Sequence, residues 1–409
     1  MKILYLHPKS WSGEYAMLLR LRDMGHQVCA LEEERDLPQG ARWASDHFRQ
    51  PGDRIETLWY DPRRGAEKLL TWPFDRLVRR AFEGRNLAHR MWIILAALRR
   101  FRPDVILCSD GFTYAIPASF LKRLGLMHTR LIVGYIGGDI LDCPDAAYGK
   151  RRTWLTDRLI KASLVAPEVL RPVSPLLETV LLGDGAAKER ICVCPSHLVA
   201  PSETLLDVGS RRREISTVVR KRHGISPEAP LVVTLSLNQQ GKGLHILARA
   251  WGIVLAAHPE ARWLLCGPHN PWTEQQVWPV LNAAGAGDTV IATGRLDGVE
   301  VFEHFAAADL HVNPSLCEGL NMATVEAAAV GTPTITSNGA GIADWVERFG
   351  AGAVVGAGEA GELADAIILA LRDRAILTRW AQGAQAMAQD FALERIAGQL
   401  QQLMDPSWP

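Results

Sequence analysis

The sequence of 409 residues lacks an excess of charge of either sign: 45 lysines and arginines balance 45 aspartates and glutamates, for a formal net charge of +0. Proteins devoted to nucleic-acid binding carry a basic excess, so this balance argues against that class. Long apolar runs are missing as well, because the longest covers only residues 91–98. A helix that spans a bilayer needs about 20 apolar residues, so the sequence predicts no transmembrane helix.

Disulfide and metal motifs are also absent. The seven cysteines form no CxxC pair and their number is odd, which argues against a disulfide framework and favours a reducing, cytoplasmic environment. The twelve histidines contain no HxxxH spacing, and no DxD motif follows a predicted strand. We therefore expect neither a disulfide framework nor a metal site. The apolar N-terminal run is too short for a signal peptide and predicts a first strand.

What the sequence does contain is a regular alternation of short apolar runs and helical patterns. In the first half, strands are predicted at 2–6, 28–31, 105–108 and 131–136, with helices at 14–24, 76–100 and 115–124. In the second half, strands are predicted at 231–237, 263–266, 290–292, 310–313 and 334–336, with a helix at 244–257. Such alternation is typical of α/β domains with a parallel sheet.

The alternation occurs twice, so we expect two Rossmann-like domains, 1–203 and 204–384. The predicted junction is rich in proline and serine, and a helical segment, 385–409, is expected to pack back on the first domain. Residues 1–203 hold 30 basic and 24 acidic residues, a net charge of +6, whereas residues 204–409 hold 15 and 21, a net charge of −6. The overall neutrality thus combines a basic and an acidic domain.

Two glutamates, Glu318 and Glu326, mark the most informative stretch. A strand is expected to end near Asn313, and a helix to start near Leu320, so the free N–H groups at that helix start could hold an anion. Eight helical residues would separate the two carboxylates by about 12 Å. Apolar residues flank Glu326 on every side, and a carboxylate there is costly unless hydrogen-bond donors meet it. Glu318 could alternatively cap the helix.

Lys242 is the only lysine after Lys221. It lies in a glycine-flanked loop after a predicted strand, where a compact ammonium group suits a diphosphate. An exposed loop lysine that caps a turn is the alternative.

These residues resemble a known family. Glu318 and Glu326 lie in PSLCEGLNMATVEAAAVGTP, 314–333, which resembles the Glu-x7-Glu signature of GT-B glycosyltransferases, group 1 or family 4. The segments SLNQQGKG, 236–243, CGP, 266–268, and GRL, 294–296, resemble the donor-binding loops of the same family in the same order. Before residue 170 the resemblance is weaker but collinear.

The resemblance implies two domains that face each other across a cleft, and retaining transfer of a hexose from a nucleotide-sugar, without a metal, to a glycan or lipid-linked acceptor in envelope polysaccharide or glycolipid synthesis. The leaving phosphate would itself deprotonate the acceptor. By resemblance, Lys242 neutralises the diphosphate, Glu318 positions the sugar and Glu326 binds the ribose. The further donor contacts implied are Gly319, Leu320, Asn321, Arg295, Asn238, Gly267 and Gly13.

The sequence departs from the family at two points. Residues 237–240 lack the usual arginine before Lys242, and Ile136 stands where a cleft histidine is common. Asp139 either takes over a catalytic contact with the sugar or caps the next turn. Asp110 and the loop with Gly13 are further candidates, with plain turns as alternatives. A catalytically weak or silent binding subunit of the same fold, or a sugar-nucleotide epimerase, therefore stays an alternative.

Two other segments each allow a structural and a functional interpretation. Residues 72–102 are rich in arginine and aromatic side chains, which favours either a solvated helix or peripheral contact with an anionic membrane surface at the cytoplasmic face. Residues 356–361 match GxGxxG, but no strand is predicted after the following helix. We therefore interpret them as a turn rather than a dinucleotide site.

Overall fold

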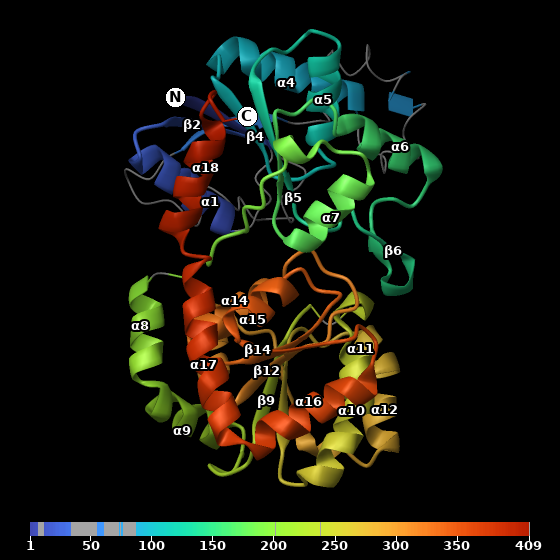
Figure 1. The fold of residues 1–409 in the computed structure, drawn as a ribbon, viewed down its shortest axis with the longest axis vertical. Helices are drawn as coiled ribbons and strands as arrows, with labels where there is room; N and C mark the ends of the chain where they lie inside the picture. The colour runs from blue at the N-terminus through green and yellow to red at the C-terminus, as the bar shows by residue number, and fades with distance from the viewer. Residues whose placement is uncertain are drawn as a thin grey trace. The chain divides into compact units, whose positions relative to one another are not determined.

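A computed structural model describes residues 1–6, 12–33, 55–60, 73, 75–76, 87–200, 202–237 and 239–408. The chain divides into two compact units (Figure 1). Unit 1 comprises residues 1–142, 149–199 and 393–409, and unit 2 comprises residues 143–148 and 200–392. The boundaries therefore lie at 199/200 and 392/393, where the sequence suggested 203/204 and 384/385, and a six-residue excursion of the first half belongs to unit 2.

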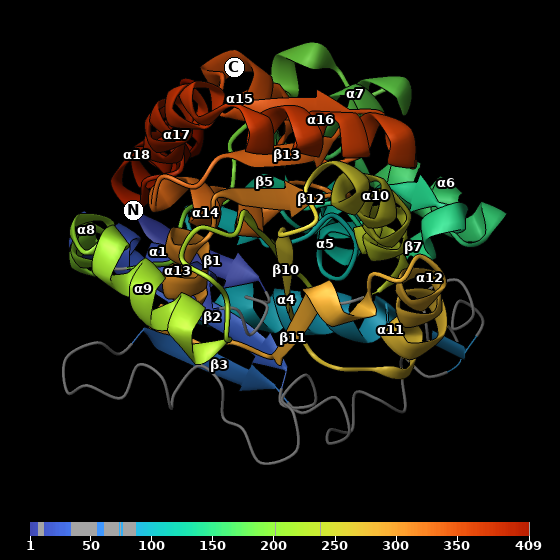
Figure 2. The ribbon, with the colours of Figure 1, turned by 90° about the horizontal axis from the view of Figure 1, so that it is seen from below.

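Unit 1 is built on a six-stranded sheet with the strand order β3-β2-β1-β4-β5-β8. All neighbouring strands are parallel, and Figure 2 shows β1, β2 and β3 side by side. Their bounds are β1 Lys2–Leu6, β2 Gln27–Glu33, β3 Glu56–Tyr60, β4 Val105–Cys108, β5 Arg130–Tyr135 and β8 Val169–Pro172. Strands β1, β4 and β5 are almost wholly buried, as expected for a parallel sheet with both faces covered.

The helices of unit 1 follow the predicted alternation. Their bounds are α1 Ser12–Asp23, α4 Leu87–Phe101, α5 Ala115–Arg123, α6 Trp154–Ser163, α7 Pro175–Gly183, the 3-10 turn η3 Lys188–Arg190 and, from the end of the chain, α18 Leu393–Met404. Of the basic aromatic stretch 72–102, the structure describes α4, Arg102 after it and three residues before it; the remainder lies outside the described residues.

Unit 2 carries a second six-stranded parallel sheet, with the order β11-β10-β9-β12-β13-β14. Its strands are β9 Leu231–Leu235, β10 Arg262–Cys266, β11 Val290–Gly294, β12 Leu310–Asn313, β13 Thr334–Ser337 and β14 Gly352–Val355. Trp251 and Trp263 lie fully buried in its core, with ring centroids 5.8 Å apart. The two Rossmann-like sheets confirm the predicted fold class.

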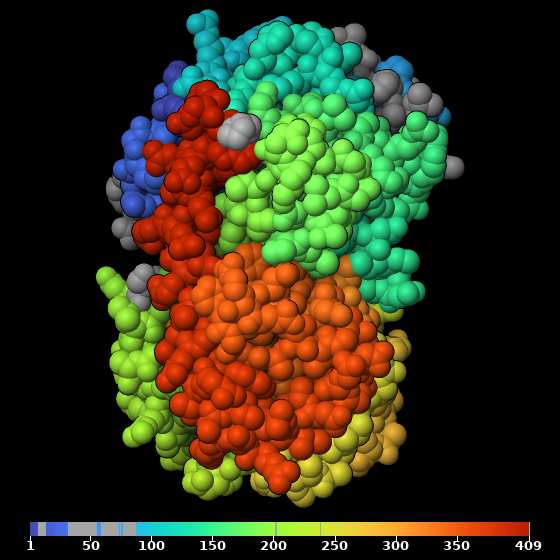
Figure 3. All heavy atoms as spheres, in the orientation of Figure 1, coloured from blue at the N-terminus to red at the C-terminus, as the bar shows by residue number. Residues whose placement is uncertain are grey.

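Helices cover both faces of this second sheet. They are α8 Ser202–Ser210, α9 Arg212–Arg222, α10 Leu244–Ala257, α11 Pro271–Gln276, α12 Trp278–Ala283, α13 Val299–Ala307, α14 Met322–Ala329, α15 Ala343–Phe349, α16 Ala360–Arg372 and α17 Arg374–Gln389, with the short turns η2 Pro144–Ala146, η4 Gln240–Lys242 and η5 Gly287–Thr289. In Figure 3, α16 and α17 lie on the visible face of unit 2, coloured orange to red. A two-stranded ribbon, β6 Asp142–Cys143 with β7 Tyr148–Gly149, brackets the turn η2.

The last helix, α18, belongs to unit 1. Its residues Ile396, Leu400 and Leu403 are buried in the same apolar cluster as Ile3 of β1 and Leu18 of α1. The guanidinium of Arg130 also donates to the Leu403 carbonyl oxygen at 3.1 Å. The break between α17 and α18 thus returns the chain to the first sheet.

Three smaller points concern the remaining predictions. The GxGxxG segment forms the turn between β14 and α16, and β14 is the last strand of its sheet, so no βαβ unit is completed there. Strands β3, β8 and β14 were not predicted, and neither was the short ribbon of β6 and β7. No helix within the described ranges is long and apolar enough to cross a bilayer.

Candidate active site

The candidate site residues of unit 2 gather at one edge of its sheet. Loops leave the carboxyl ends of β9, β10, β11 and β12, and these loops carry Lys242, Gly267, Arg295 and Glu318 respectively. The strand order reverses between β9 and β12. In open parallel α/β sheets, ligands bind outside the carboxyl ends of the strands at this reversal.

The backbones of the loops after β9 and β12 are in direct contact. The N–H of Leu316 donates to the Gly241 carbonyl oxygen at 2.8 Å. Gly243 has φ of +67°, and a Cβ placed on it would lie 1.8 Å from the Pro314 carbonyl oxygen. Only glycine fits there, since it tolerates positive φ and has no side chain. The two glycines beside Lys242 therefore let the loop dock against the segment that carries Glu318.

Lys242 and Glu318 form an ion pair across this contact, from Nζ to Oε1. Their side chains are 19% and 16% exposed, so the pair is shielded but reachable from solvent. Each was expected to meet a different part of a ligand. In the structure each neutralises the other.

A polar network fixes the second carboxylate oxygen of Glu318. The Asn321 side-chain amide donates to Oε2 at 2.7 Å, and the Ser315 hydroxyl lies 2.9 Å from it. Asn321 also donates to Oδ1 of Asn313 at 3.0 Å, and Asn313 donates to the Thr336 hydroxyl at 3.0 Å. Side chains from β12, β13 and the intervening loop thus hold Glu318 in one orientation.

Asn321 also starts the following helix. Its side-chain oxygen accepts a hydrogen bond from the Thr324 N–H at 2.8 Å, the usual bond of an N-cap residue. Helix α14 therefore begins at Met322, and Glu318 does not cap it. The helical estimate of about 12 Å does not apply, because Glu318 lies in the loop before the helix. Gly319 and Leu320 are buried in the same loop.

Glu326 lies in the second turn of α14 and is half-buried. Burial raises the pKa of its carboxyl group to about 7. Within the described part of the chain, no hydrogen bond or ion pair reaches this carboxylate. A carboxylate in such a place is costly unless hydrogen-bond donors meet it, and its binding of a ligand stays a prediction.

The remaining donor-site candidates of unit 2 differ in exposure and in their contacts, and one of them lies outside the described residues. Gly267 follows β10, and its N–H donates to the Gly294 carbonyl oxygen at 2.9 Å. Arg295 follows β11, is 71% exposed and pairs with Asp297 at 3.0 Å. Asn238 lies outside the described residues. Gln240, in the segment that lacks the usual arginine, donates to the Asp145 carbonyl oxygen at 2.6 Å.

In unit 1, the side chain of Asp139 binds backbone N–H groups. Its carboxylate accepts hydrogen bonds from the N–H groups of Gly111 at 2.7 Å, Gly137 at 2.8 Å and Ile136 at 3.1 Å. Both oxygens are thereby used to join the loops after β4 and β5, which is the turn-capping alternative. Asp110 likewise accepts from the Phe112 N–H at 2.8 Å.

Gly13 is part of a helix rather than a loop. Helix α1 begins at Ser12, so Gly13 lies in its first turn, and residues 7–11 lie outside the described part of the chain. Glu14 in that turn favours an early start, because an acidic side chain interacts well with the positive end of the helix dipole.

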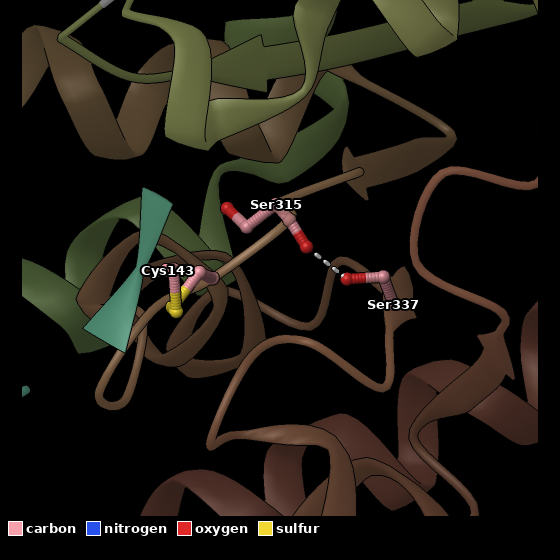
Figure 4. Close-up of a disulfide and its surroundings, with 4 residues drawn as sticks. Cys143, Ser315 and Ser337 are labelled. Atoms are coloured by element: carbon pink, nitrogen blue, oxygen red, sulfur yellow. Dashed lines mark hydrogen bonds between the residues drawn. A yellow bond between two sulfur atoms is a disulfide. The ribbon is translucent and has the colours of Figure 1, made fainter. Parts of the chain in front are cut away.

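A disulfide joins Cys143 to Cys317, so the expectation of no disulfide is wrong. The two residues are 174 positions apart, with their Cα atoms separated by 6.5 Å. Figure 4 shows the disulfide near Ser315, whose carbonyl oxygen accepts a hydrogen bond from the Ser337 hydroxyl. Sequence spacing gave no sign of this pair, because the contact arises only when η2 packs on η4.

Sequence reasoning also missed the polar support of Glu318. Asparagine before an apolar helix is a recognisable N-cap signal, so the capping role of Asn321 could have been found. The contacts of Asn313, Ser315 and Thr336 depend on two strands lying side by side, and no local pattern indicates them. Among the residues that the structure describes, no cluster of three histidine, cysteine or acidic side chains could hold a metal ion.

Two family profiles match the chain. Residues 229–373 match "Glycosyl transferases group 1", and residues 15–197 match "Glycosyl transferase 4-like domain". The two profiles correspond to the parts of the chain that carry the second and the first sheet.

Curated relatives are similar along most of their length. The putative colanic acid biosynthesis glycosyltransferase WcaL of Salmonella typhimurium is 25% identical over 415 residues, covering 93% of each chain. A D-inositol 3-phosphate glycosyltransferase of Pseudarthrobacter chlorophenolicus is 23% identical, covering 82% of this chain and 79% of the relative.

Solved structures share the fold. HepE of Anabaena, in complex with UDP, superimposes with a TM-score of 0.74 at 17% identity, covering 98% of this chain and 99% of that one. WaaG, a glycosyltransferase involved in lipopolysaccharide biosynthesis, superimposes with a TM-score of 0.67 at 15% identity over the full length of both chains.

Proposed function

Since this chain belongs to the group 1 glycosyltransferases with the GT-B fold, we propose that it moves a hexose from a nucleotide-sugar to a hydroxyl group of a glycan or lipid-linked acceptor. The relatives include a colanic acid glycosyltransferase and a D-inositol 3-phosphate glycosyltransferase, which supports a product of the cell envelope. Structures of HepE hold UDP and UDP-glucose, which supports a uridine nucleotide as the first donor to test.

One observation carries the proposal: Lys242 and Glu318 meet at the reversal of strand order in unit 2. An incoming diphosphate offers Lys242 a partner of higher charge than a single carboxylate, so it can displace the ion pair. Glu318 is then free to accept hydrogen bonds from sugar hydroxyls, with its orientation kept by Asn321. Glu326, which has no protein partner within the described ranges, would accept from the ribose hydroxyls.

The chemistry then rests on stabilising the leaving group. Negative charge builds on the diphosphate as the glycosidic bond breaks, and Lys242 together with the N–H groups at the start of α14 would stabilise that charge. The leaving phosphate takes the proton from the acceptor hydroxyl on the same face of the sugar, so the anomeric configuration is retained. No protein nucleophile and no metal ion take part in this scheme. Asp139 is assigned the role of holding the loops after β4 and β5.

One observation favours a second candidate, a weak or silent transferase that binds the donor without turnover. Gln240 stands in the segment where the family usually has an arginine, and its amide is engaged with the Asp145 carbonyl oxygen. The set of cations that would face the diphosphate then contains one member fewer. This lowers the electrostatic stabilisation of the transition state.

The test is a thermal-shift screen of the whole chain against UDP-, GDP-, ADP- and dTDP-sugars, followed by a transfer assay with the donor that binds. We expect one nucleotide class to raise the Tm, the Glu326→Ala variant to lose that shift, and turnover to persist in EDTA. Binding without turnover would favour the silent candidate. The absence of any shift would contradict donor binding, and loss of turnover in EDTA with recovery on adding a divalent ion would contradict the metal-free scheme.

A further inference from the structure

Residues 143–148 lie directly against the loop of Lys242. We call them the clamp segment. They belong to unit 2, although the chain on both sides of them belongs to unit 1. The Asp145 carbonyl oxygen accepts a hydrogen bond from the Gln240 side chain at 2.6 Å. A Cβ placed on Gly241 would lie 3.4 Å from the Ala146 carbonyl oxygen, so the two backbones pack closely.

A covalent bond joins the clamp segment to the second loop of the candidate site. Cys143 opens the segment, and Cys317 directly precedes Glu318 in the chain. The disulfide therefore fixes the backbone position of the residue next to the carboxylate that pairs with Lys242. The clamp segment thus contacts the Lys242 loop through Gln240 and Gly241 and the Glu318 loop through sulfur.

The disulfide can be reached by a reductant from one side. Cys143 is half-buried, and its neighbours Asp142 and Pro144 are exposed. Cys317 is only 7% exposed. An external thiolate will therefore attack the sulfur of Cys143 and release Cys317 as the leaving thiolate. Of the five free cysteines, Cys192 is half-buried, and Cys29, Cys108, Cys194 and Cys266 are buried.

We propose that the Cys143–Cys317 disulfide is a site of thiol–disulfide exchange that sets the affinity of the donor site. This inference rests on the proposed function. In the first step a dithiol reductant forms a mixed disulfide with Cys143, and the Cys317 thiolate leaves. In the second step the free thiol of the reductant attacks the reductant sulfur that is bonded to Cys143. The Cys143 thiolate leaves. Two electrons and two protons pass to the protein, and the reductant becomes a cyclic disulfide.

The oxidised protein is the form with the higher donor affinity. With the disulfide intact, the clamp segment is held against the Lys242 loop before the donor arrives. After reduction, the clamp segment keeps the side-chain hydrogen bond from Gln240, which is an exposed contact and therefore weak. Donor binding must then supply the ordering of the clamp segment, and each backbone residue that is ordered on binding lowers affinity by about fivefold or more.

The test measures nucleotide affinity by calorimetry on the full chain, using UDP or whichever nucleotide the thermal-shift screen selects, before and after treatment with dithiothreitol. Thiol titration in denaturant should first find five free thiols, and seven after reduction. We expect reduction to weaken nucleotide binding about fivefold or more. The Cys143→Ser variant should bind like the reduced protein and ignore dithiothreitol. Cys192→Ser, which removes the other half-buried thiol, should respond like the wild type.

Several results would overturn the inference. They are seven free thiols in protein kept under air, equal affinity before and after reduction, or a response to dithiothreitol that survives in Cys143→Ser. Because the wild type alone gives the first two readings, a variant that fails to fold leaves the question decidable. Equal affinity in both forms removes the switch and leaves the proposed function standing. No nucleotide affinity in either form removes both.

Discussion

At the scale of single residues, the Lys242–Glu318 ion pair is the contact that a charged ligand at the candidate site has to disrupt. A shielded pair of opposite charges offsets part of its own desolvation cost. In the proposed scheme a donor breaks this ion pair and replaces it with contacts to a diphosphate and to sugar hydroxyls.

The first prediction concerns this pair. Lys242→Ala removes the cation proposed to face the leaving diphosphate, and Glu318→Ala removes the carboxylate proposed to contact the sugar. Each change should lower kcat/KM at least about tenfold, which corresponds to roughly 1.4 kcal/mol of transition-state stabilisation. Steady-state transfer kinetics measure the effect. Lys221→Ala, at an exposed lysine of α9, is the matched control and should stay at wild-type activity; a variant of Lys242 with equal activity would contradict the role.

The second prediction uses the raised pKa of Glu326, about 7 in the folded chain against an ordinary value of 4.5. Between these values the folded state holds a proton that the unfolded state has released, so stability falls as the pH rises from about 4.5 to about 7. Glu326→Gln removes this dependence. We expect the variant to match the wild type near pH 5 and to be more stable at pH 8, by on the order of 1–3 kcal/mol.

Chemical denaturation at the two pH values measures the difference. The same variant should lose the stabilisation that bound nucleotide gives the wild type, since an amide cannot replace an ionised carboxylate as acceptor for two ribose hydroxyls. If the stability of the wild type changed between pH 5 and pH 8 by the same amount as the stability of the variant, the pKa of Glu326 would not be raised.

At the scale of elements, the strand ends were predictable and the contacts between loops were not. Strands β1, β4 and β12 have the bounds expected from their apolar runs, and the other predicted strands agree within two residues at each end. Strand β8 was missed because its sequence, VLRP, has only two apolar residues before an arginine and Pro172. The polar network around Glu318 could not be predicted, since it depends on which strands become neighbours.

Gly243 offers a test at this scale. Gly243→Ala places a Cβ 1.8 Å from the Pro314 carbonyl oxygen, so the loops after β9 and β12 must separate. Gly285 has nearly the same backbone angle, with φ of +66°, but nothing lies within 4 Å of its added Cβ. Gly285→Ala therefore carries only the cost of the positive φ, about 1 kcal/mol.

We expect Gly243→Ala to lower the Tm more than Gly285→Ala and to weaken nucleotide binding, which Gly285→Ala should leave unchanged. Calorimetric unfolding scans and nucleotide titrations give the two readings. If both variants lost the same stability and kept the same affinity, the close approach of the two loops would have no part in the donor site.

At the scale of the whole molecule, the chain crosses between its units more often than its composition suggests. The opposite charges of the two halves were visible in the sequence, and so was a helical C-terminal segment. The excursion 143–148 was not visible in the sequence, because the six residues CPDAAY give no periodic signal. The disulfide of Cys143 is hidden for the same reason.

The return of α18 to unit 1 leads to the fourth prediction. Leu400 is 3% exposed in the core that also contains Ile3 and Leu18. Leu400→Ala should therefore lower the stability of unit 1 by about 2–5 kcal/mol. Hydrogen exchange resolved by mass spectrometry should show faster exchange in β1 and β5 and unchanged exchange in β9 and β12. Gln401→Ala, at the exposed neighbouring position, is the control; faster exchange in both units would contradict the assignment.

The three-segment make-up of unit 1 also bears on the order in which the chain is completed during synthesis. Unit 2 has all its residues once position 392 has been added, whereas unit 1 still lacks α18. Domains generally fold in the order in which they leave the ribosome. Here the part that is synthesised first is finished last. Until α18 emerges, the apolar cluster that it shares with β1, β5 and α1 lacks one of its components, so a nascent chain stalled after residue 392 exposes apolar surface that a chaperone can bind.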